Sequence, residues 1–305
     1  MISPAYRSQV DLLIRILPHV ANETMFALKG GTAINLFERG MPRFSIDIDL
    51  TYLPFKERAE ALGEIADGLR RIKQSLAGAI PGIQINESSP RDAEETKLIC
   101  LLQKAQVKIE VNTIMRGQLW PIRDMQLAQN AQEEFQKFAA INVVSHAELH
   151  GGKICAALDR QHPRDLFDVH QLLSSDGLIE EVRLGFIAAL LSHPRPLHEV
   201  IRPNFQDQRN LFDAQFAGMT NQSFTYDEYE STRERLVREI LENLTDEDRN
   251  LLLSFKRGEP TWSLFPVAAL QQLPAVQWKL ANIQRLKKNA RKHAEQLQAL
   301  EVALS

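Results

Sequence analysis

Two stretches near the start of the chain decide the fold, FALKGGTAIN at residues 26–35 and RFSIDIDL at residues 43–50. In the first stretch, an apolar run has the composition of a short strand, and Gly30 and Gly31 then permit a tight turn. Thr32 can cap the helix expected after them. Such a turn suits a phosphate group, because the first N–H groups of a helix are unpaired and no Cβ blocks their approach. An ordinary strand-to-helix turn has the same pattern, so the glycines alone leave both interpretations open.

The second stretch predicts a strand with one apolar and one polar face. Apolar and polar residues alternate over residues 46–51, which places Asp47 and Asp49 on the same face with their Cα atoms about 7 Å apart. Two aligned anions repel, and the repulsion is relieved by solvent, by a basic partner or by a divalent cation such as Mg²⁺, which takes oxygen ligands. A solvated acidic strand face is the alternative.

A third carboxylate is expected on a neighbouring strand. Over residues 106–114 apolar positions alternate with polar ones, so Glu110 lies on a polar face. Because paired strands lie about 4.8 Å apart, this face could bring Glu110 beside Asp47 and Asp49. The alternative is an exposed glutamate paired with Lys108 or another base.

The character of the sequence changes at residue 145. Ser145 with Glu148 three residues later is a capping-box pattern that predicts the start of a helix, and from here the chain has helical periodicity almost throughout. We therefore expect an α/β domain over residues 1–144 and a helical domain over residues 145–305.

Charged residues are dense at the start of the second domain. Lys153 and Arg160 share one face of the first helix, and Pro163 begins a second helix whose first turns carry Asp165 and Asp168. Acids in a first helical turn also interact favourably with the helix dipole, so capping and packing are an alternative explanation for this pair. The density of charge within one helix-turn-helix element favours a binding site.

These residues carry a family resemblance. Gly-Gly-Thr at residues 30–32 followed by R-x-S-x-D-x-D at residues 43–49 resembles the nucleotidyltransferase toxins of the AbiEii abortive-infection group, in the DNA-polymerase-β-like superfamily. The stretches KICAALDR at residues 153–160 and RDLFD at residues 164–168 are similar in type to the family's helices that close the nucleotide site, with the apolar positions displaced by one residue. The resemblance implies an α+β fold, with a polymerase-β-like nucleotidyltransferase domain containing a mixed sheet followed by an all-helical domain that completes the nucleotide site.

The resemblance also implies roles for individual residues. The implied catalytic residues are Asp47, Asp49, Lys153 and Asp165. The implied Mg²⁺ ligands are Asp47, Asp49 and Glu110, the last at a position where many relatives would carry Asp. The implied phosphate-binding residues are Gly30, Gly31, Thr32, Ser45, Lys153 and Arg160. Lys153 would contact the triphosphate, and Asp165 would orient it or act in proton transfer.

By the same resemblance, the chain would transfer a nucleoside monophosphate from an NTP to RNA, tRNA in particular, by two-metal phosphoryl transfer with loss of pyrophosphate. It would act as a toxin restrained by a cognate antitoxin. One alternative is nucleotidyl transfer to a hydroxyl group of a small molecule or protein. A second, from another class, is a non-catalytic protein that binds nucleic acid or a partner.

Composition sets the broad class. A chain of 305 residues can bury two cores, and its net charge of −3 argues against a uniformly basic nucleic-acid binder while permitting a local basic patch. Cys100 and Cys155 lie in apolar patterns, which favours buried thiols over a disulfide and indicates a reducing compartment. With no signal peptide and no apolar run near the ~18 residues of a membrane span, we expect a soluble cytoplasmic protein.

Two further groups of residues leave alternatives open. We expect the histidines around the second cluster to lie at the surface or at helix caps rather than in a zinc site; they are His146, His150, His162 and His170. A basic run near the C-terminus is either a solvated helix end or an RNA-contacting surface; it comprises Lys279, Arg285, Lys287, Lys288, Arg291 and Lys292.

Overall fold

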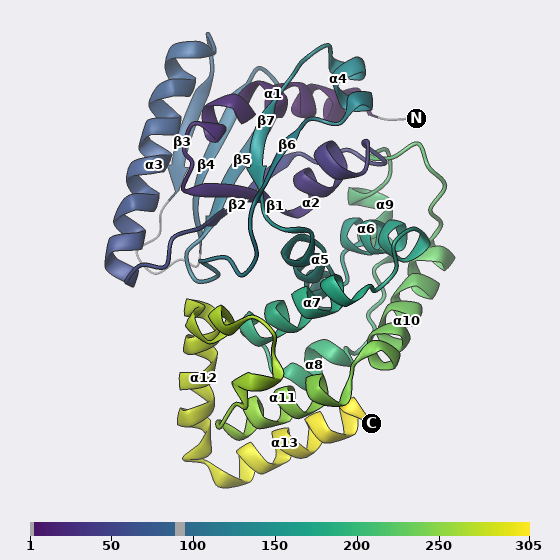
Figure 1. Ribbon diagram of the computed structural model, residues 1–305. Coiled ribbons are helices and arrows are strands. Elements are labelled where there is room, and N and C mark those ends of the chain that lie inside the picture. The colour runs from purple at the N-terminus through teal and green to yellow at the C-terminus, as the bar shows by residue number, and fades with distance from the viewer. Residues whose placement is uncertain (1–2, 89–94) are drawn as a thin grey trace. The chain divides into compact units, whose positions relative to one another are not determined.

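The computed structural model describes residues 3–88 and 95–305 (Figure 1). The chain forms two compact units. The first, here called the sheet unit, contains the chain up to Ser145 together with Phe216–Ser223. The second, called the helical unit, contains His146–Gln215 and Phe224–Ser305. The chain therefore returns once to the sheet unit. A single boundary between residues 144 and 145 would assign this returning segment to the helical domain instead.

The sheet unit is built on a mixed sheet, which in the described residues has seven strands. The strands are β1 (Phe26–Lys29), β2 (Asp47–Tyr52), β3 (Gln84–Ser88), β4 (Glu95–Leu102), β5 (Ala105–Asn112), β6 (Arg123–Gln126) and β7 (Ala140–Val143). Their order across the sheet is β3-β4-β5-β2-β1-β7-β6. The pairs β2–β5 and β1–β7 are parallel and the other neighbours antiparallel. The predicted mixed sheet followed by a helical region is thus confirmed.

Two helices cover the apolar face of this sheet. The alternation predicted for β2 and β5 places Ile48 and Ile109 on one face, both fully buried. Helix α1 (Pro4–Ala21) packs on β5 and β7, and α3 (Arg58–Ala79) packs on α1, β3 and β4. Figure 1 shows α3 running alongside β3. The opposite face of the central strands carries the polar residues.

The remaining elements of the sheet unit are short. They are α2 (Gly30–Thr32), the π-helix η1 (Ala33–Glu38) and α4 (Gln129–Phe135). The sequence predicted an ordinary α-helix from Ala33. Instead, the Asn35 side-chain amide donates to the Gly31 carbonyl at 2.9 Å, which occupies an acceptor of the α-helical ladder where the wider π-turn begins.

The returning segment pairs with the chain just before β2. Phe44 N–H donates to the Met219 carbonyl at 2.7 Å, and Thr220 Oγ donates to the Pro42 carbonyl at 2.7 Å. Arg43 and Thr220 form an antiparallel bridge. These bonds fix the backbone that leads into the Asp47–Asp49 strand.

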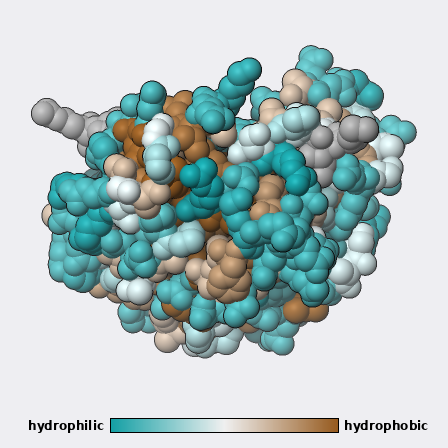
Figure 2. Space-filling view, turned by 90° about the horizontal axis from the view of Figure 1, so that it is seen from above, coloured by the Kyte–Doolittle hydropathy of each residue, from teal (hydrophilic) through white to brown (hydrophobic). Residues whose placement is uncertain are grey.

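The helical unit consists of packed helices joined by short connections. They are α5 (His146–Arg160), α6 (Pro163–Ser174), α7 (Glu180–Ser192), α8 (Leu197–Ile201), α9 (Arg209–Gln215), α10 (Tyr226–Asn243), α11 (Asp246–Arg257), η2 (Trp262–Leu264), η3 (Ala268–Gln272), α12 (Pro274–Lys287) and α13 (Ala290–Leu304). Thr245 and Asp248 form the capping box at the start of α11 that their spacing indicates. Within the described ranges, no helix is both long and apolar enough to cross a bilayer. Figure 2 shows a mainly hydrophilic face with hydrophobic side chains gathered in a few places.

Helices α5 and α7 approach each other backbone to backbone. A Cβ atom added to Gly151 would overlap the main chain at Gly185, and one added to Gly185 would overlap the Ala147 carbonyl. Both glycines are therefore required by packing. The neighbouring Gly152 has open space around its Cα.

We expect Gly151→Ala to destabilise the protein by about 2–3 kcal/mol, because the two helix backbones must separate to admit a methyl group. Gly152→Ala is the matched control, and it should gain about 0.5–1 kcal/mol from helix propensity. Urea unfolding of the three proteins measures both effects. Equal stability of the two variants would show that the α5–α7 contact is not as close as described.

Candidate functional site

The pairing of β2 with β5 places the three predicted carboxylates on one face of the sheet. In this parallel register Asp49 lies opposite Glu110, and Asp47 lies opposite Lys108. Side chains at paired positions share a face, so Asp47, Asp49 and Glu110 point to the same side, away from the buried face of Ile48. The carboxylates thus lie side by side as the sequence predicted.

Two lysines flank the pair formed by Asp49 and Glu110. Lys29 of β1 lies opposite Asp49, and Lys97 of β4 lies opposite Glu110 with its Nζ 3.6 Å from a carboxylate oxygen. Lys29, Asp49, Glu110 and Lys97 therefore form a row across four neighbouring strands. The Lys97–Glu110 pair is partly exposed, and such pairs contribute little to stability. Loss of this one ion pair would therefore cost little stability.

The donor set fits a hard divalent cation. Three carboxylates at adjoining register positions supply only oxygen ligands, which is the preference of Mg²⁺. The sequence alternative was a glutamate paired with Lys108 or another base. Lys108 lies opposite Asp47, and the basic partner of Glu110 in this structure is Lys97.

The glycine turn lies directly against these carboxylates. Gly30 has φ +71°, in the left-handed region that favours glycine, and a Cβ atom there would overlap the Asp49 carboxylate. A Cβ atom on Gly31 would lie 2.7 Å from Arg43 Nη2 and 3.0 Å from Ser45 Oγ. The two glycines are therefore required because charged and polar side chains pack on the turn.

Arg43 is a residue whose place the sequence did not reveal. It belongs to the quoted motif, but periodicity gave it no role. The residue is 2% exposed, and its guanidinium lies beneath the Gly31 turn. Its Nη1 donates to the Phe44 carbonyl at 2.8 Å. Arg43 therefore packs under the Gly31 turn and bonds to the backbone that leads into β2.

Thr32 is not the helix cap that the sequence predicted. Thr32 ends α2 and directly precedes η1, at the predicted position, but its side chain makes no capping hydrogen bond, and it is fully buried. Its hydroxyl is 3.0 Å from Ser45 Oγ and 2.5 Å from the Asp47 carbonyl, to which it donates. Thr32 thus joins the turn to the first residue of β2, and backbone N–H groups rather than this hydroxyl are available for a phosphate.

The second predicted cluster is assembled within the helical unit. Lys153 on α5 is 7% exposed, and its Nζ lies 2.8 Å from Asp165 and 3.0 Å from Asp168, both on α6. Arg160 reaches the other oxygen of Asp165 at 2.8 Å. The cap of α6 is His162, whose ring accepts a hydrogen bond from Arg164 N–H. Helix capping therefore does not explain why Asp165 and Asp168 lie here. Both form ion pairs with Lys153.

The electrostatics of this cluster keep Asp165 ionised. Burial by itself would raise the pKa of the Asp165 carboxyl, but the charges of Lys153 and Arg160 outweigh it and hold the pKa well below its usual range. A buried cation shared by two carboxylates needs such partners, because an unpaired charge is costly to remove from water.

Several other residues considered from the sequence are buried in the structure. His150 is fully buried, with its ring centroid 4.4 Å from that of His146, so the expectation of a surface or capping role is wrong for this histidine. Lys279 does not belong to a basic surface. It is 6% exposed, donates to the Leu190 and Arg195 carbonyls, and burial lowers its pKa to about 7. Both cysteines are buried thiols, as expected.

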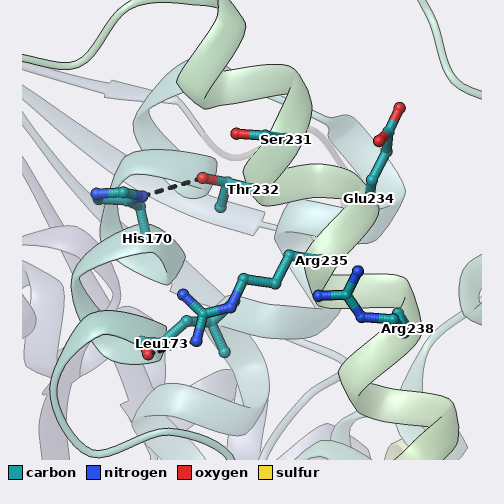
Figure 3. A pocket seen from close by; sticks show the side chains of 7 residues that line it. All are labelled: His170, Leu173, Ser231, Thr232, Glu234, Arg235 and Arg238. Carbon is teal, nitrogen blue, oxygen red and sulfur yellow. Dashed lines mark hydrogen bonds between the residues drawn. The ribbon is translucent and has the colours of Figure 1, made fainter.

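The helical unit also has a pocket of about 300 Å³ beside α6 and α10 (Figure 3). His170 of α6 lines it, with Nδ1 3.0 Å from Thr232 Oγ. Arg235 of α10 points across toward Leu173 and donates to its carbonyl at 2.8 Å. No motif in the sequence indicates this pocket, and the predicted site residues do not line it.

Comparison with known families decides the classification. Residues 11–282 match the family described as nucleotidyl transferase AbiEii toxin, type IV TA system. The chain belongs to the AbiEii family. This AbiEii protein is therefore a nucleotidyltransferase toxin of a type IV toxin–antitoxin system, as the motifs at residues 30–32 and 43–49 had indicated.

A solved structure has the same fold. The nucleotidyltransferase toxin MenT4 from Mycobacterium tuberculosis H37Rv matches with a TM-score of 0.60 and 16% identity, over 98% of the AbiEii chain and 94% of MenT4. A search of curated proteins returned no match.

We expect Asp165→Asn to cost about 2–3 kcal/mol at pH 7, because it leaves the buried Lys153 with one carboxylate. The folded-state pKa of Asp165 is depressed, so its contribution is complete above the unfolded value near pH 4 and is lost as the pH falls towards the folded value. The difference between wild type and variant should therefore shrink by about 1.4 kcal/mol per pH unit below about pH 4. Urea unfolding at pH 7, 5 and 3 tests this, with the exposed Asp213→Asn as control. A pH-independent difference would contradict the assignment.

Proposed function

We propose that this AbiEii protein transfers a nucleoside monophosphate from an NTP to RNA, with tRNA as the acceptor, that Mg²⁺ is its cofactor, and that it acts in the cytoplasm under the control of a cognate antitoxin. The register of β2 and β5 carries the proposal, because it sets Asp49 beside Glu110 and next to the Gly30 turn. Family membership supports the transferase activity, the NTP substrate and the antitoxin.

The sheet unit would bind the triphosphate. Asp47, Asp49 and Glu110 would hold Mg²⁺, which when bound supplies positive charge against the phosphate oxygens. The backbone N–H groups after Gly30 and Gly31 would bind the phosphates, as the first turn of a helix does. Ser45 and Thr32 would fix the turn against β2, given their 3.0 Å contact. Lys29 and Lys97 would limit the repulsion between the carboxylates before the substrate binds.

The helical unit would supply the cation. Lys153 has three N–H donors, of which two are directed at Asp165 and Asp168, so one remains to contact a phosphate. Arg160, also held by Asp165, would be a second contact. Because the pKa of Asp165 is depressed, its carboxylate is a weak base, and we assign it to orienting Lys153 rather than to proton transfer.

Loss of the carboxylates should abolish transfer. With labelled NTPs, Mg²⁺ and total RNA, Asp47→Asn and Asp49→Asn should each lower the rate by about 10³-fold or more, and Glu110→Gln by about 10–100-fold, because each replaces a charged carboxylate ligand with a neutral amide. Chelation of Mg²⁺ should have the same effect as the aspartate variants. Asp67→Asn, an exposed change on α3, should leave the rate unchanged.

The labelled product distinguishes the alternatives. Label in RNA supports the proposal, and label in a small molecule or protein would replace the RNA acceptor. No transfer to any acceptor, or transfer unchanged in the aspartate variants, would contradict the assignment of the site.

The contribution of the helical unit is tested separately by NTP binding. We expect Lys153→Met to weaken binding of Mg²⁺–NTP by about 10-fold or more, because it removes a charge-assisted hydrogen bond to phosphate. Isothermal titration calorimetry measures this, with the exposed Lys288→Met as control. An unchanged affinity would show that the helical unit does not complete the nucleotide site, and would leave the role of the carboxylates intact.

A further inference from the structure

The sheet unit contains a buried arginine that the proposed reaction does not use. Arg116 lies in the loop after β5 and is 4% exposed. Its Nε is buried with no hydrogen-bond partner, and Nη1 makes one long bond, 3.4 Å, to the Lys56 carbonyl. A guanidinium has five N–H donors, so most donors of Arg116 have no acceptor among the residues that the structure describes.

The charge of Arg116 is not neutralised by an ion pair among the described residues. Burial lowers the pKa of Arg116, and the charge of a second cation, Arg58, lowers it further, while Tyr52 and Glu57 act in the opposite direction. Lys56 is already held by Glu60 and Glu64, at 2.7 and 2.6 Å. Burial of an uncompensated cation is costly, so a missing anion is the simplest partner for this group.

The surroundings of Arg116 favour an anion. Arg58 is the first residue of α3, a helix of 22 residues whose N-cap residue makes no side-chain capping bond. The first N–H groups of such a helix are unpaired, and its dipole favours negative charge. Arg58 Nη1 donates to the Thr113 carbonyl at 3.3 Å, and Arg116 Nη1 reaches the carbonyl of Lys56 just before the helix. Both guanidinium groups therefore lie between the start of α3 and the loop after β5.

This location is separate from the carboxylates. The loop is tied to the end of β2 by a 2.8 Å hydrogen bond from Gly117 N–H to the Tyr52 carbonyl. Tyr52 shares the apolar face of Ile48 and contacts α3 through Glu64, whereas Asp47 and Asp49 point to the opposite face. Tyr52 is three residues beyond Asp49, which is about 10 Å along the strand.

We propose that Arg116, Arg58 and the first turn of α3 form a second anion site, and that its ligand is a phosphate group. A tetrahedral oxyanion can accept from two guanidinium forks and from helix N–H groups at once. The group comes either from free phosphate or a phosphomonoester, or from the backbone of an RNA strand. The site requires neither NTP nor transfer, so its test is independent of the proposed function.

Thermal unfolding of the full chain, titrated with orthophosphate at constant ionic strength, tests the site. The wild type and Arg70→Gln, which removes an exposed arginine about 18 Å farther along α3, should show a saturable rise in Tm of about 5 °C at a hundredfold excess over Kd. Arg116→Met should show no saturable rise. Without phosphate, it should be at least as stable as wild type, because a buried unpaired charge is gone.

A rise in Arg116→Met equal to that of wild type, or no saturable rise in wild type, would overturn the proposal. If Arg116→Met does not fold, Arg58→Gln decides, since Arg58 is exposed at the helix start and its loss should raise the half-saturating phosphate concentration about threefold or more. An unchanged half-saturation in Arg58→Gln would equally overturn it.

Binding of a labelled single-stranded RNA in the absence of NTP identifies the source of the phosphate. RNA that binds more weakly to Arg116→Met than to Arg70→Gln, and is displaced by orthophosphate, supports an RNA backbone phosphate. RNA affinity that is equal in both, with protection by orthophosphate still dependent on Arg116, supports free phosphate or a phosphomonoester.

Discussion

The parallel pairing of β2 with β5 is the constraint on which the candidate site depends. It sets Asp49 directly beside Glu110 and encloses the two anions between Lys29 and Lys97. A shift of one residue would turn the carboxylates into the buried face, so burial of the apolar residues on the other face enforces the register. The hydrophobic core thus stabilises an arrangement of like charges that would not assemble by itself, and the Gly30 turn packs against it.

Lys153 and Arg116, one buried cation from each unit, have opposite surroundings. In the helical unit, Lys153 is shared by Asp165 and Asp168, so the charge is compensated before any ligand binds. In the sheet unit, Arg116 has, within residues 3–88 and 95–305, one long hydrogen bond and a neighbouring cation. The aspartates hold Lys153 in position for the proposed substrate, whereas Arg116 keeps N–H donors for the proposed anion.

Several sequence predictions failed where the relevant partner is distant in the chain. Thr32 has the composition of a cap, but its hydroxyl bonds to Ser45 and Asp47 instead. Lys279 has the pattern of a basic surface, yet packing of α12 against α7 buries it on two backbone carbonyls. Local periodicity does not contain this information, because it reports which face of an element a residue occupies and not what covers that face.

By itself, the sequence determined the local features of this AbiEii protein. Alternation placed Asp47 and Asp49 on one strand face, and the glycine pair marked the turn before them, because these depend on backbone geometry over a few residues. Only the tertiary structure decided that Glu110 lies opposite Asp49, that Arg43 lies beneath the turn and that Arg116 is buried. These facts depend on strand order and on loop packing, which bring residues far apart in the chain into contact.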